Sequence, residues 1–180
     1  MSEIKNGRSV VDVRSPTRLF VICAILLTVL AVNSVRGESS KTELQSTAAD
    51  ERTFLHQEVE LDARPQRIYE ILLDSKEFSA FSGEPAQISP VAGGSISMFG
   101  GKIVGRNVEL VPNQRIVQAW RERSWESGVY SLVKFELKDQ GSKTKIIFDH
   151  TGFGEGHFEH LNVGWKLRYW EPLEKFVTAK

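Results

Sequence analysis

The segment HLNVGWKLRYWEPLEKF, residues 160 to 176, constrains the fold more than any other part of the sequence. Its apolar residues recur at spacings of three and four, as on one face of a helix. The face consists of Leu161, Trp165, Tyr169 and Leu173, followed by Phe176 and Val177. Pro172 removes one backbone donor and predicts a bend near the last turns. A face with such large rings requires a wide apolar surface opposite it.

The preceding part of the chain offers that surface as a series of short strands. Alternating apolar and polar residues predict strands in TFLHQEVELDA, SISMF, KIVGRNVELV, RIVQAWRERSW, VYSLVKFELK and KTKIIFDH. Short turns rich in Gly, Pro and Asn separate the last five, which are therefore expected to be antiparallel neighbours in a meander. We predict an α+β protein whose strongly curved sheet is covered by the C-terminal helix.

Two short helices are expected between the first strand and the meander. Pro65 is typical of a first helical turn, where its missing N–H has no partner to lose. A second helix is predicted from Ser75, with Phe78 and Phe81 three residues apart, and Gly83 should end it.

The N-terminal part carries a short hydrophobic segment behind a basic flank. Residues Leu19 to Val32 are uncharged and mostly apolar. The basic residues before them are Lys5, Arg8, Arg14 and Arg18. This layout predicts either a signal peptide over residues 1–37, cleaved before Glu38, or an N-terminal membrane anchor formed by residues 19–35. Both interpretations predict export to a periplasmic or extracellular location, and no membrane contact except through this segment.

Residues 38–51 lack apolar periodicity and are expected to form a flexible linker, which leaves residues 52–180 as the folded domain. Beyond residue 37 the chain has 18 basic and 21 acidic residues, a formal net charge of −3. Such a balance argues against a nucleic-acid partner, which would require many phosphates to be neutralised. Cys23 is the single cysteine, so the chain cannot form an internal disulfide.

Several ordered motifs resemble one protein family. They are the two Gly-Gly turns, the Leu-Val-Pro-Asn turn before a strand ending in Trp120-Arg121, then Trp125, Gly128 and Tyr130, and finally Gly164-Trp165, Tyr169-Trp170 and Pro172-Leu173. With the order of elements above, residues 53–178 resemble the helix-grip fold of the START-like (SRPBCC) superfamily. Within it they are similar to the domain named after the C-terminal half of the activator of the 90-kDa heat-shock protein ATPase.

The resemblance implies a cavity between the sheet and the C-terminal helix that binds a small, largely apolar ligand. The candidate cavity residues are Phe81, Met98, Trp120, Val133, Phe135, His150, Trp165 and Tyr169. Two alternatives remain: a co-chaperone-like module that binds a protein partner and has a filled cavity, and an enzyme of the cyclase or hydratase kind. In the family's eukaryotic co-chaperones a second, N-terminal domain grips the chaperone, whereas this sequence has the predicted export signal in that position.

The sequence offers no catalytic constellation. It contains no G-x-S-x-G elbow, phosphate-binding loop, dinucleotide fingerprint or H-E-x-x-H motif. His157 and His160 form a bare H-x-x-H, which is a weak metal signal without further ligands. We therefore predict a non-catalytic domain with no metal site and no cofactor, and we interpret His150 as a core histidine on the concave face of the sheet.

Overall fold

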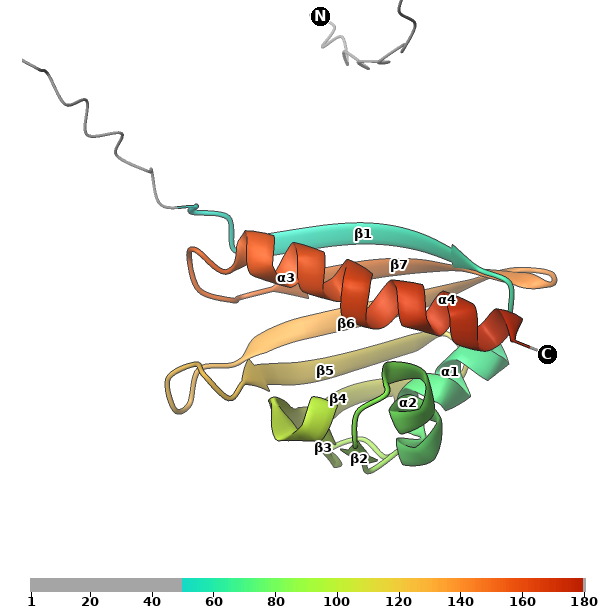
Figure 1. Cartoon of the computed structure of the whole chain (residues 1–180), viewed down its shortest axis with the longest axis horizontal. Coiled ribbons are helices and arrows are strands. Elements are labelled where there is room, and N and C mark those ends of the chain that lie inside the picture. The colour runs from blue at the N-terminus through green and yellow to red at the C-terminus, as the bar shows by residue number, and fades with distance from the viewer. Residues whose placement is uncertain (1–49, 180) are drawn as a thin grey trace, which may run out of the picture. The chain divides into compact units, whose positions relative to one another are not determined.

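The structure, a computed structural model, describes residues 50–179 (Figure 1). The predicted signal peptide or anchor at residues 1–37 lies outside the described residues, and so does the predicted linker at 38–51 except for its last two positions. Within residues 50–179 no helix is long and apolar enough to cross a membrane.

Seven strands form one antiparallel sheet. They are β1 (Phe54–Leu61), β2 (Gln87–Ile88), β3 (Ser95–Met98), β4 (Ile103–Val111), β5 (Arg115–Glu122), β6 (Ser131–Gln140) and β7 (Lys143–Thr151). The strand order is β1-β7-β6-β5-β4-β3-β2, so strands β2 to β7 form a meander and β1 returns to pair with β7. The predicted meander of β3 to β7 is therefore confirmed, the two-residue strand β2 adds to it without having been predicted, and β1 forms the opposite edge of the sheet.

The helices lie where the sequence predicts them. Helices α1 (Pro65–Leu73) and α2 (Ser75–Ser82) follow β1, and a short 3₁₀ turn, η1 (Phe99–Gly101), joins β3 to β4. The Asp74 side chain accepts hydrogen bonds from the first amides of α2, and Gly83 ends α2 in a left-handed conformation. The C-terminal helix crosses in front of the sheet (Figure 1). The α+β, helix-grip prediction is confirmed.

The C-terminal helix is not α-helical throughout. It consists of α3 (Phe158–Trp165), the π-helical segment η2 (Lys166–Trp170) and α4 (Glu171–Thr178), and Pro172 lies in the first turn of α4. In a regular α-helix Trp170 would lie roughly 140° around the axis from Trp165, away from the sheet. The wider π turn brings it back, and Trp170 is buried. Its indole N–H donates a hydrogen bond to the side chain of Gln57 on β1.

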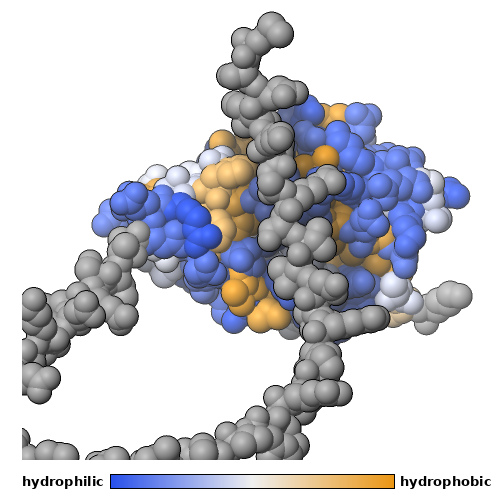
Figure 2. Space-filling view, turned by 90° about the horizontal axis from the view of Figure 1, so that it is seen from above, coloured by the Kyte–Doolittle hydropathy of each residue, from blue (hydrophilic) through white to orange (hydrophobic). Residues whose placement is uncertain are grey.

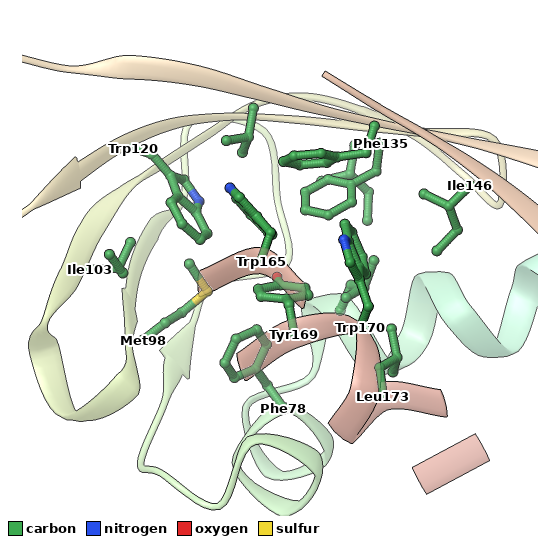
Figure 3. Packing of buried hydrophobic residues seen from close by; sticks show 14 of the residues in the cluster. Phe78, Met98, Ile103, Trp120, Phe135, Ile146, Trp165, Tyr169, Trp170 and Leu173 are labelled. Atoms are coloured by element: carbon green, nitrogen blue, oxygen red, sulfur yellow. The ribbon is translucent and has the colours of Figure 1, made fainter. Parts of the chain in front are cut away.

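The core lies between the concave face of the sheet and this helix. Alternate residues of β6 and β7 are buried along the strands, as the period of two predicts. The aromatic rings of the helix lie against them (Figure 3). Trp165 is 4.2 Å from Phe148 between ring centroids, and Trp170 is 5.3 Å from the same ring. The helix therefore covers the apolar face that the meander would otherwise expose.

Replacing Trp165 tests this packing. We expect Trp165→Ala to lower the free energy of unfolding by about 3–5 kcal/mol, because it leaves a cavity between helix and sheet. Leu167 is 53% exposed on the opposite side of the same helix, and Leu167→Ala should change stability by less than about 0.5 kcal/mol. Urea unfolding monitored by far-UV circular dichroism measures the free energy of unfolding of both variants. Equal losses of stability in the two variants would contradict the described packing.

Candidate functional site

Two stacked indoles join the sheet to the C-terminal helix. Trp120 lies on β5 and Trp165 at the end of α3, with ring centroids 4.6 Å apart and ring planes 23° from parallel. Tyr169 lies one turn further along the helix, 4.7 Å from the ring of Trp165. Figure 3 shows Trp120 reaching from the sheet toward the two helical rings. These three side chains form the aromatic centre of the site.

A buried hydrogen-bond chain fixes Trp165. Its Nε1–H donates to Nδ1 of His150 at 3.1 Å, so the proton of the neutral imidazole lies on Nε2. Nε2 then donates to Oγ of Ser131 at 2.7 Å, and the Ser131 hydroxyl donates to the Trp120 carbonyl at 3.2 Å. Burial lowers the pKa of His150 to about 3. His150 is thus a neutral, fully hydrogen-bonded group, as interpreted from the sequence.

A second buried chain fixes Trp120. Its Nε1–H donates to Oε1 of Gln118 at 3.0 Å, and Nε2 of Gln118 donates to Oδ1 of Asn107 at 2.9 Å. The amide of Asn107 in turn donates to the Ser89 carbonyl at 2.8 Å. Asn107 faces inward at a register shift of β4, where the pairing with β5 skips one residue. Both indole N–H groups therefore have buried acceptors, as a low-dielectric interior requires.

A pocket opens beside the stacked indoles. It lies between the C-terminal helix, the ends of β4 and β5, and the η1 turn, and its volume is about 490 Å³. Six apolar side chains line it: Phe99, Ile103, Trp120, Leu161, Trp165 and Tyr169. Small-molecule sites of proteins have volumes of roughly 300–1,000 Å³ and similar apolar linings. The volume and the apolar lining of this pocket fall within those ranges.

The η1 turn forms a strained wall of the pocket. Phe99 has φ = 53°, a left-handed conformation that is unfavourable for a bulky residue, and Gly100 and Gly101 follow it with positive φ. The ring of Phe99 lies 6.0 Å from that of Tyr169. Strained backbone of this kind persists only where the surrounding structure holds it, and such positions cluster at ligand sites.

Polar groups lie at the depth and at the mouth of the pocket. Tyr169 is 2% exposed, and it is one of the residues that line the pocket. Burial raises the pKa of Tyr169, so the hydroxyl keeps its proton and remains a donor. At the mouth, Glu122 contacts His160 at 3.3 Å and the hydroxyl of Ser124 at 3.4 Å. The pocket thus combines a mostly apolar lining with a few polar groups.

The structure divides the eight predicted cavity residues into two groups. Trp120, Trp165 and Tyr169 line the pocket. The other five are buried in the packed core beside it: Phe81, Met98, Val133, Phe135 and His150. Period-two and helical spacing found the buried residues, but they could not distinguish core from pocket lining.

The other twelve residues that line the pocket are not among the eight candidates from the sequence, and three of these twelve matter most for the argument below. Arg123 follows the end of β5, Arg168 lies on η2, and Gly164 lies on α3. Gly164 was noted only as part of the Gly164-Trp165 motif. The spacing of Gly164 and Arg168 from Leu161 and Trp165 offered a helical signal for both, whereas nothing in the pattern around Arg123 indicated a pocket.

His150 and the two histidines of the H-x-x-H pattern have separate partners in the structure. His150 is hydrogen-bonded in the core, His157 packs against Trp125 with ring centroids 5.4 Å apart, and His160 contacts Glu122. Within the described range 50–179, no group of three or more His, Cys, Asp or Glu residues is arranged to hold a metal ion.

Residues 62–178 match the family of Activator of Hsp90 ATPase homolog 1-like proteins, and the chain belongs to this family. It is 26% identical to the human activator of 90 kDa heat shock protein ATPase homolog 1 over 111 residues, which are 62% of this chain and 33% of that protein. It is 32% identical to the Dictyostelium discoideum homologue over 108 residues, 59% of this chain and 28% of that protein. The chain thus spans about a third of the length of these relatives.

Solved structures share the fold. An HSP90 activator from Plasmodium falciparum superimposes with a TM-score of 0.64 at 24% identity, covering 68% of this chain and 94% of that chain. The Aha1 dimer from Colwellia psychrerythraea gives a TM-score of 0.61 at 19% identity, covering 70% of this chain and 96% of that one. The domain is therefore an Aha1-like SRPBCC domain.

The low pKa of His150 predicts how stability depends on pH. An unfolded histidine binds a proton near pH 6.5, whereas folded His150 does so only near pH 3. Between these values the unfolded state binds more protons, so the free energy of unfolding should fall as pH falls, by up to about 1.4 kcal/mol per pH unit. Above pH 6.5 this contribution is fully present.

His150→Gln should remove this pH dependence, because glutamine can accept from Trp165 and donate to Ser131 but does not titrate in this range. The measurement is urea unfolding at intervals from pH 7 to pH 4.5. His160→Gln removes an exposed histidine and serves as the matched control. If the free energy of unfolding depends on pH with the same slope in His150→Gln and in the parent chain, the interpretation of His150 as a neutral core histidine is wrong.

Proposed function

We propose that the domain is a non-catalytic binding module that takes a small, largely apolar ligand in the pocket beside Trp120, Trp165 and Tyr169. The observation that carries the proposal is the pocket itself. Its volume is about 490 Å³, and its rings are fixed by buried hydrogen bonds. Preorganised aromatic walls favour binding, because little side-chain freedom is lost when a ligand enters.

Gly164 supports the same proposal. It lies inside α3 and lines the pocket, and a Cβ atom at this position would meet nothing within 4 Å. Its φ lies outside the left-handed range that favours glycine. Neither the backbone conformation nor contacts with neighbouring atoms therefore require a glycine at this position. Glycine inside a helix costs about 1 kcal/mol relative to alanine. The space above Gly164 is therefore retained at a cost in helix stability, as expected if a ligand uses it.

Binding of the uncharged fluorophore N-phenyl-1-naphthylamine to the full chain tests the proposal. We expect saturable binding that Gly164→Trp weakens by about tenfold or more, because the indole would occupy the space of an aromatic group of the probe. Gly164→Ala is the matched control, and it should weaken binding much less than Gly164→Trp while raising the melting temperature. Equal affinity of the probe for the parent chain and both variants would show that the probe binds outside the pocket, and it would contradict the proposal.

A second candidate function is stimulation of the ATPase activity of a 90-kDa heat-shock protein. It is favoured by the names of the relatives, which are activators of that ATPase, although the chain spans only about a third of their length. The helix also exposes Val163 and Leu167, four residues apart. Figure 2 shows apolar areas between hydrophilic ones on the face seen from above. Such areas are available for contact with a protein partner.

Measuring ATP hydrolysis by a purified Hsp90 with increasing amounts of the chain tests this candidate. A saturable increase that Gly164→Trp leaves intact would assign the activity to the outer surface of the domain. No increase at saturating chain would exclude direct activation.

We also propose that the domain acts outside the cytoplasm. The support is the basic flank and the hydrophobic run at Leu19–Val32 in the sequence. Cell fractionation, with N-terminal sequencing of the recovered protein, separates cleavage before Glu38 from anchoring by residues 19–35. Recovery of the chain from the cytoplasm with its first residues intact would contradict export.

A further inference from the structure

The mouth of the pocket carries an excess of positive charge. Three basic side chains line it, Lys102, Arg123 and Arg168, together with the one carboxylate of Glu122. That carboxylate already contacts His160 and the Ser124 hydroxyl. Among the described residues, the pocket therefore combines an apolar interior with basic side chains at its entrance.

Arg123 is the cation best placed to receive a ligand. Its backbone N–H donates to the Lys102 carbonyl at 2.8 Å, which ties the end of β5 to the η1 turn. Its Nη1 lies over that turn, 3.7 Å from where a Cβ of Gly101 would be. Throughout residues 50–179 no carboxylate forms an ion pair with the Arg123 side chain. A planar guanidinium at this position can pair with a carboxylate, sulfonate or phosphate group.

Arg168 adds to this charge from the helix. Glu84 serves two cations at once, with Nζ of Lys102 at 2.9 Å and Nη1 of Arg168 at 3.9 Å. The contact to Arg168 is at the limit of an ion pair, so its charge is largely uncompensated by Glu84. Even when Glu84 is counted, the entrance keeps more positive than negative charge.

We propose that the ligand is an amphipathic anion, with an aromatic or aliphatic body in the pocket and an acidic group at Arg123 and Arg168. The assignment rests on the proposed ligand-binding function and specifies its chemical class. The apolar body contacts Trp120 and Trp165. The hydroxyl of Tyr169, which lines the same pocket, donates to a polar atom of that body.

Two fluorophores that differ only in an acidic group test the assignment. 8-Anilinonaphthalene-1-sulfonate is N-phenyl-1-naphthylamine with one added sulfonate. The full chain should bind the sulfonate about tenfold more tightly than the neutral probe, as expected for a charge-assisted hydrogen bond at a solvated site. Raising the ionic strength from 0.1 M to 1 M should weaken binding of the sulfonate alone, because salt screens exposed charges.

Arg123→Gln should remove the advantage of the sulfonate, measured as the ratio of the affinities of the two probes for the same variant. Arg106→Gln is the matched control, because Arg106 is an exposed arginine on β4 that does not line the pocket. Circular dichroism and melting temperature verify that both variants are folded. Because Arg123 is exposed, its replacement should not affect folding.

The possible results distinguish the proposed anionic class of the ligand from the proposed ligand-binding function itself. If both probes bind equally, or if Arg123→Gln weakens neither, the anionic class is overturned, while sensitivity of the neutral probe to Gly164→Trp still upholds the pocket. If neither probe responds to Gly164→Trp, the ligand-binding function fails, and the anionic class fails with it. A sulfonate advantage that Arg123→Gln removes and Arg106→Gln retains supports the assignment.

Discussion

The stack of Trp120 on Trp165 is the contact on which the rest of the structure depends. It joins β5, in the middle of the sheet, to the C-terminal helix. The two elements are far apart in the sequence, because β6 and β7 lie between them. Each indole N–H is bound by a buried acceptor, Gln118 for one ring and His150 for the other. Loss of either acceptor would leave a buried donor unsatisfied, so both rings have a defined position and orientation. The pocket is consequently a preformed space beside a rigid pair of rings.

The same hydrogen bonds decide what chemistry the site can perform. His150 keeps both ring nitrogens engaged and remains neutral over the physiological range, so it is not available as a general base. The Tyr169 hydroxyl keeps its proton. The family match identifies the domain, whereas its function depends on the chemistry of this particular site.

Small residues and local strain make the pocket as much as its aromatic walls do. Gly164 leaves a gap on one side of the helix, and the turn from Phe99 to Gly101, which has left-handed backbone conformations, lines the same pocket. The π turn η2 places Tyr169 and Trp170 side by side on the buried face. Irregular helical turns of this type often occur at functional sites, because they aim side chains that a regular helix would place elsewhere.

The sequence by itself determined six of the seven strands, the meander of the last five, the three helical regions and most buried residues, because periods of two and 3.6 follow from local backbone geometry. The short strand β2 and the pairing of β1 with β7 were decided only by the tertiary structure. It also carried the family motifs. Only the tertiary structure decided that Trp170 faces the core, since the π turn breaks the helical period. The same holds for the division between core and pocket, and for the place of Arg123 at the entrance. These depend on packing between segments distant in sequence, which no local pattern records.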